Sequence, residues 1–158
     1  MPQKSIEVTG LDEILDKLKV ADAQTNIAVI GQFKVWSQFA VDTSREEIEN
    51  VSAVDLGELR DGMHYNLSFN PPESVIKPST FADSYAGDVE LGTPPHFVPI
   101  GDLVGWADRH GIPAILVQRK IAREGTEPRL FWEATFEKVD KHIGNNIKDL
   151  GDEIIRRL

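Results

Sequence analysis

The 158-residue sequence contains no cysteine, so disulfide bonds, thiolate metal sites and cysteine nucleophiles are excluded. It also lacks an apolar run near the roughly 20 residues that a membrane-spanning helix requires. Its N-terminus has no basic segment followed by an apolar one, which is the pattern of a secretory signal. We therefore expect synthesis in the cytoplasm and no membrane partner.

Positive charge is scarce in this chain. The formal net charge is −9, and the segment from Asp42 to Asp61 holds seven acidic residues against two arginines. Nucleic-acid affinity depends mainly on basic contacts to phosphate, so this composition argues against a sequence-specific nucleic-acid binder. We interpret the acidic run as a solvated helix face. The only cluster of basic residues in the sequence is Arg119, Lys120 and Arg123, with Arg109 and Arg129 nearby.

The remaining composition is that of a globular protein, with 41% hydrophobic and 27% charged residues. The length suits one sizeable core and is short for two. We predict a single domain over residues 1–158.

Two long helices are predicted from apolar periodicity. The first covers residues 21–50, which contain no proline, and its buried face is Val29, Phe33, Trp36 and Ala40. Its acidic end, residues 45–49, is expected to overhang the core and project into water. The second begins at Pro128 and runs to the C-terminus, with an apolar stripe at intervals of three and four residues: Phe136, Val139, Ile143, Ile147, Leu150, Ile154 and Leu158.

Shorter elements are predicted before the first long helix and between the two long helices. Residues 5–9 resemble a strand, and a helix is expected after Thr9. Asp55 with Glu58 three residues later predicts a capping box for a helix over residues 56–62. Two further helices are expected over residues 103–110 and 112–125, each followed by a glycine or ended by one.

Strands are predicted over residues 64–70, 74–78 and 85–91. In the first, Tyr65, Leu67 and Phe69 should point inward. In the last, Tyr85 to Leu91 alternate between two faces. Short connections favour antiparallel pairing. The predicted fold is therefore α+β, with a small antiparallel sheet of three to four strands packed against the two long helices, and with short helices and a projecting arm between them.

The arm is the segment 93–99, which holds three prolines in seven residues. Prolines fix φ and remove donors, so the segment is stiff and loses little entropy when it docks. We predict that it contacts a neighbouring molecule. The alternative is that the prolines only end a strand and that Phe97 returns to the local core. The predicted contact residues are Thr93, Pro94, Pro95, His96, Phe97 and Trp106.

One group of residues could support chemistry. Asp88 and Glu90 would share a strand face, and His96 could fold back towards them. A small metal-dependent hydrolase is therefore an alternative function. The opposing interpretation is that the acids are solvent-facing and His96 belongs to the arm. No zinc-protease, phosphate-loop, nucleophile-elbow or dinucleotide motif accompanies them.

Four short motifs resemble the head–tail joining, or tail-completion, morphogenesis proteins of long-tailed phages, a family close to the phage minor tail protein Z. The first is Tyr85-Ala86, Val89-Glu90 and the run Gly92-Thr93-Pro94-Pro95-His96; the second is Gly57, Leu59 and Arg60 after Val54-Asp55. The third is Leu103, Trp106 and Ala107; the fourth is Ile121, Arg123, Gly125-Thr126, Pro128, Phe131 and Ala134. The motifs span residues 54–134, and the second departs from the family pattern at Ala53, Leu56 and Gly62.

The resemblance implies a structural virion protein without enzymatic activity or cofactor, forming a ring at the head–tail junction after assembly in the host cytoplasm. The implied partners are further copies of the chain and tail-tube, tail-terminator or head-connector proteins. An interaction module encoded by a host from a prophage remnant is a further alternative. The residues that carry the implied structural motif are Gly57, Leu59, Arg60, Tyr85, Glu90, Gly92, Gly125 and Pro128.

Overall fold

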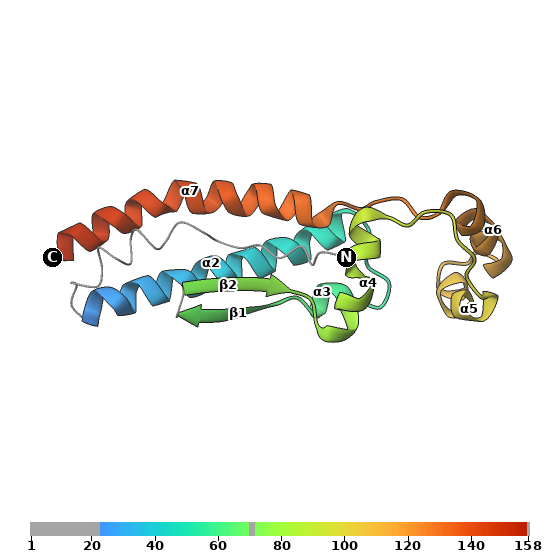
Figure 1. Ribbon diagram of the computed structural model, residues 1–158, viewed down its shortest axis with the longest axis horizontal. Helices are drawn as coiled ribbons and strands as arrows, with labels where there is room; N and C mark the ends of the chain where they lie inside the picture. Colours follow the sequence, from blue (N-terminus) through green and yellow to red (C-terminus); the bar gives the residue numbers. More distant parts are fainter. Residues whose placement is uncertain (1–22, 70–71, 158) are drawn as a thin grey trace.

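The computed structural model describes residues 23–69 and 72–157 (Figure 1). The strand predicted over residues 5–9, the helix predicted after Thr9, and Leu158 lie outside the described residues. The described part is mixed helix and strand, and mostly helical. None of its helices is long and apolar enough to cross a membrane.

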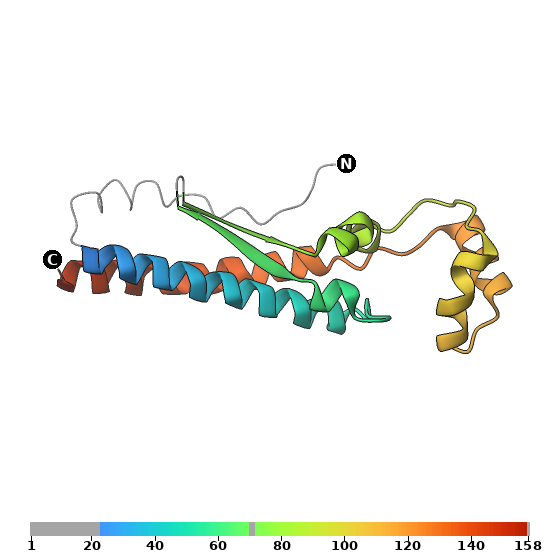
Figure 2. The same cartoon turned by 90° about the horizontal axis from the view of Figure 1, so that it is seen from below.

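Two long helices form the main body. Helices α2 (Ala23–Asn50) and α7 (Phe131–Arg157) run antiparallel and side by side in both views (Figures 1 and 2). The predicted face of α2 is confirmed, because Val29, Phe33, Trp36 and Ala40 are all buried. The acidic end of α2 does not overhang the core as predicted. There Ile48 is completely buried, and the buried Glu47 accepts a hydrogen bond from Lys138 of α7.

The apolar stripe of α7 is only partly buried. Val139 and Ile154 lie in the interior, whereas Phe136 is 53% exposed. The helix begins at Phe131, three residues after the predicted start at Pro128. The delay has a local cause: Leu130 has a positive φ of 53°, outside the helical region, and its N–H donates to the Glu90 carbonyl.

The sheet has two strands where three to four were predicted. β1 (His64–Phe69) and β2 (Pro72–Lys77) form an antiparallel hairpin in which Tyr65 pairs with Ile76. The hairpin packs on α2 through the buried Ile76 and through a 2.7 Å hydrogen bond between the Ser37 and Ser74 hydroxyls. Phe69 was predicted to point inward, but it lies at the turn end of the hairpin, opposite Pro72, and is exposed.

The predicted strand over residues 85–91 is wrong, since these residues belong to helix α4 (Thr80–Leu91). Ser79 caps this helix by accepting a hydrogen bond from the Ala82 N–H. The buried residues Ala82, Ala86 and Glu90 recur every four residues, which is the helical period. Residues 85–91 taken alone alternate as a strand does, and the helical period becomes visible only when Ala82 is included.

Short helices connect these elements. In α3 (Glu58–Asp61) the predicted capping box is absent: Gly57 is the N-cap, with a φ of 86° and no side-chain cap.

The predicted helices that follow the arm are confirmed as α5 (Ile100–Arg109) and α6 (Ala114–Glu124). These two helices pack mainly on each other and stand apart at one end of the molecule (Figures 1 and 2). Two chain segments join them to the body.

The stripe of α7 provides a stability test with an adjacent control. Ile154 is 6% exposed and Ile155 is 70% exposed. We expect Ile154→Asp to lower the free energy of unfolding by about 2–4 kcal/mol, because it buries an unpaired charge. Ile155→Asp should change it by less than about 0.5 kcal/mol. Chemical denaturation measures both, and equal stabilities of the two variants would contradict burial of this stripe within one chain.

Candidate functional site

The two segments that carry α5 and α6 cross at one point. We call these segments, residues 92–99 and 125–130, the waist. Thr93 and Thr126 form an antiparallel bridge, with backbone N–H to carbonyl distances of 3.2 Å and 3.0 Å and their hydroxyls 2.9 Å apart. His96 N–H adds a bond of 3.3 Å to the Ile121 carbonyl. The entry to and exit from the α5–α6 hairpin are therefore held together.

Two glycines make this close approach possible. A Cβ atom added to Gly125 would lie 1.9 Å from the Thr93 carbonyl oxygen, and one added to Gly92 would lie 2.3 Å from the Thr126 carbonyl oxygen. Both glycines have positive φ with ψ near ±180°, a region that is essentially restricted to glycine. Each glycine is followed directly by threonine, so the repeated Gly-Thr pair was the sequence signal of the crossing.

A buried carboxylate joins the waist to the body. Glu90 is 1% exposed, and its Oε2 accepts a 2.9 Å hydrogen bond from the Trp132 N–H in the first turn of α7. The N–H groups of Arg129 and Leu130 donate to the Glu90 carbonyl. Glu90 therefore ties the end of α4 to the start of α7, and a negative charge at a helix N-terminus is favourable.

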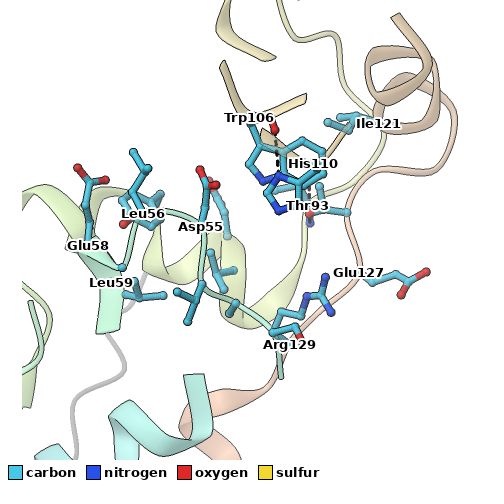
Figure 3. A pocket seen from close by; sticks show the side chains of 18 of the residues that line it. Asp55, Leu56, Glu58, Leu59, Thr93, Trp106, His110, Ile121, Glu127 and Arg129 are labelled. Atoms are coloured by element: carbon cyan, nitrogen blue, oxygen red, sulfur yellow. Dashed lines mark hydrogen bonds between the residues drawn. The ribbon is translucent and has the colours of Figure 1, made fainter. Parts of the chain in front are cut away.

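A cleft of about 500 Å³ lies beside the waist, between the loop that precedes α3, helix α4 and the α5–α6 hairpin. Figure 3 shows Asp55 and Leu59 on one side and Trp106 and His110 on the other, with Arg129 below Trp106 and His110. The rings of Trp106 and His110 stack with centroids 4.1 Å apart. Partial burial raises the pKa of the Tyr85 hydroxyl, which also lines the cleft.

One ion pair joins the loop before α3 to the end of α5, beside the cleft. The guanidinium of Arg109, at the end of α5, donates two hydrogen bonds to the carboxylate of Asp55. Nε donates to Oδ1 at 2.9 Å, and Nη2 donates to Oδ2. These hydrogen bonds lower the pKa of Asp55 and raise that of Arg109. Sequence reasoning assigned Asp55 to a helix cap and missed this pair, because the two residues are 54 positions apart.

The residues assigned to the structural motif gather around the waist and the cleft. Leu59 is buried, and Arg60 binds the carboxylates of Asp61 and Glu49 at 2.7 Å and 2.6 Å. Residues of this set that line the cleft are Gly57, Leu59 and Tyr85; those at the waist or beside it are Glu90, Gly92, Gly125 and Pro128.

The predicted contact residues divide into two groups. Pro94, Pro95 and Phe97 are exposed, and Phe97, at 74%, is the most exposed large hydrophobic residue in the part of the chain that the structure describes. Phe97 therefore does not return to the local core. Thr93 and Trp106 are only half-exposed and line the cleft. His96 is exposed at the cleft edge, where its Nδ1 lies 2.9 Å from the Pro94 carbonyl oxygen.

The hydrolase hypothesis required Asp88 and Glu90 on one strand face, and this geometry is wrong. On helix α4 they point apart: Asp88 is exposed, whereas Glu90 is buried against α7. Among the residues that the structure describes, no three histidines or acids are grouped so as to hold a metal ion.

Comparisons with protein-family models, with curated proteins and with solved structures found no match to this chain.

The glycine crossing can be tested by alanine substitution. We expect Gly125→Ala to lower the free energy of unfolding by more than about 2 kcal/mol, because the new Cβ meets backbone and the φ of 77° is strained. The control is Gly144→Ala in α7, where nothing lies within 4 Å of the new Cβ. There alanine should stabilise by about 0.5–1 kcal/mol. Thermal and chemical unfolding measure both, and equal effects would contradict a glycine-dependent crossing.

The ion pair between Arg109 and Asp55 predicts a titration result. The pKa of Asp55 should lie below its usual 3.8 and return towards that value in Arg109→Gln, because the hydrogen bonds are lost. Since the pKa of Asp55 is depressed in the folded state, the ion pair stabilises the fold above about pH 4. This stabilisation is lost as the pH falls through the folded-state pKa. NMR titration of the side-chain carboxyl carbons measures the pKa of Asp55 in both proteins. Asp61, whose pKa is lowered by Arg60, is the internal control and should not change. An unchanged Asp55 pKa in Arg109→Gln would show that the pair does not form.

Proposed function

We propose that this chain is a structural assembly protein that forms a ring at the head–tail junction of a long-tailed phage or prophage. In this role it acts without enzymatic activity or a cofactor. Its partners are further copies of itself and a tail-tube, tail-terminator or head-connector protein. The motif resemblance supplies the family, and the surface of the α5–α6 hairpin supplies the physical support.

The observation that carries the proposal is the apolar exposure of this hairpin. Ala107 is the only fully buried hydrophobic residue of α5, and α6 has none. Large apolar side chains are instead exposed along the hairpin and the arm that leads to it: Phe97, Ile100, Val104, Ile112, Ile115 and Leu116. Contiguous exposed apolar side chains mark interaction sites. A neighbouring molecule is the natural cover for them.

The attachment of the hairpin supports the same role. The waist holds it at a distance from the body by backbone hydrogen bonds, and Arg109 braces it against Asp55. A rigid arm that is ordered before binding loses less entropy on docking. This favours a permanent joint between subunits over a mobile lid on a reactive site.

The arm gives the test of the proposed function. We expect Phe97→Ser to leave stability within about 0.5 kcal/mol, because the side chain is exposed in the single chain. Loss of its burial in an interface, about 1.5–3 kcal/mol, weakens association about 10- to 100-fold. In a complementation assay, heads and tails should accumulate unjoined. Replacement of residues 95–98 by a Gly-Ser linker should have the same effect.

The matched control is Val35→Ser, which removes an exposed apolar side chain from α2. This variant should join heads to tails normally. Phe97→Leu, which keeps apolar bulk, should retain most activity. Normal joining by both the Phe97→Ser and the linker variants would contradict the proposal.

A further inference from the structure

The outer face of α7 carries an apolar side chain surrounded by acids. Glu133, Phe136, Glu137 and Asp140 follow the i, i+3, i+4, i+7 spacing and are all exposed. Within the described residues none of these three acids forms an ion pair. The sequence pattern had placed Phe136 in the buried stripe, yet the body leaves 53% of it exposed. An exposed aromatic residue in this position lacks apolar cover within the chain.

The outer face of α6 has the opposite charge and the same spacing, with its apolar residue at the first position and not the second. Leu116, Arg119, Lys120 and Arg123 also follow the i, i+3, i+4, i+7 spacing. All four are exposed, and Leu116 is 53% exposed. Arg123 binds the adjacent Glu124, whereas Arg119 and Lys120 have no ion pair among the residues that the structure describes. This face is the basic cluster of an otherwise acidic chain.

We infer that the α6 face of one copy docks on the α7 face of the next copy. Each face spans seven residue steps, or about 10 Å of helix. Each presents three charges of one sign and one large apolar side chain, so docking can place Leu116 near Phe136 with opposite charges beside them. The inference rests on the proposed function, because it names the surfaces through which the subunits of the ring meet.

The two faces of one chain are not placed to meet each other. In both views α6 lies beyond the N-terminal end of α7, and α7 runs away from it (Figures 1 and 2). Six residues of the waist, 125–130, separate the two helices, and the Thr93–Thr126 bridge restrains them. A second copy is therefore the occupant that charge complementarity favours. Because the two faces differ, the contact is head-to-tail, and repeated contacts generate a ring if the rotation closes.

The attraction between the oppositely charged faces predicts how association depends on salt. Opposite charges steer the two faces together and fix their register, and added salt screens them. Association should therefore weaken as the ionic strength rises.

The absence of cysteine permits a direct test by cross-linking. We expect a mixture of full-length Leu116→Cys and Phe136→Cys chains to form a covalent heterodimer under mild oxidation at low salt. Each variant alone should form much less. The position control is Val35→Cys, an exposed site on α2, which should not cross-link with Leu116→Cys above background. Cross-linking in the mixture no greater than in each variant alone and in the Val35→Cys control, or none in the mixture, would overturn the inference.

Sedimentation of charge-reversed variants tests whether the contact is head-to-tail. The double variants Arg119→Glu/Arg123→Glu and Glu133→Arg/Glu137→Arg should each weaken self-association by about tenfold or more. Mixed with each other, they present the native α6 face to the native α7 face and the reversed α6 face to the reversed α7 face, so the association lost in each variant alone should be restored. Failure of the mixture to associate, while both variants remain folded by circular dichroism, would overturn the head-to-tail arrangement.

Two further outcomes separate the alternatives. If the wild type binds duplex DNA and Arg119→Glu/Arg123→Glu abolishes that binding without changing self-association, the α6 face serves nucleic acid and the inference is wrong. If the cross-link forms but the Phe97→Ser and linker variants join heads to tails normally, the contact is real and the proposed function fails instead. If joining is lost with Phe97→Ser but the cross-link is absent, the proposed function stands and this interface does not.

Discussion

The crossing of two backbone segments at Gly92 and Gly125 is the constraint on which the arrangement of this protein depends. The carbonyl groups of Thr93 and Thr126 approach the opposite segment so closely that no side chain fits at either glycine. The same two residues pair through their backbones and hydroxyls. Since both ends of the α5–α6 hairpin pass through this point, its position is set by the crossing and not by a core of its own.

The body is organised to hold that crossing. α4 ends one residue before Gly92, and the buried Glu90 connects its last turn to the first turn of α7. α7 in turn packs along α2, where Val139 and Ile48 lie in the common core. The contacts that fix the structure are thus polar hydrogen bonds at the waist and apolar packing between the two long helices. A displacement of the hairpin must strain the Glu90 hydrogen bond, the glycine crossing or the Arg109–Asp55 pair.

This division explains how one small chain can be stable and still expose apolar surface. The long helices and the β hairpin bury enough side chains for a core, whereas α5 and α6 bury almost none. The exposed surfaces therefore cost the body little stability and remain open to a neighbour. The opposite charges of the α6 and α7 outer faces select which neighbouring surface can cover them.

The sequence by itself determined the elements whose pattern extends over several turns. α2, α5, α6 and α7 were predictable because apolar spacing and end signals agree over ten or more residues, and the β1–β2 hairpin because turn residues separate two β-rich runs. Only the tertiary structure decided the rest. In residues 85–91 both periods fit, and burial of Glu90 against α7 selects the helix. Asp55 could cap α3 or bind Arg109, and Phe136 could face inward or outward. Such choices depend on which distant segment comes close, and a local pattern does not contain that information.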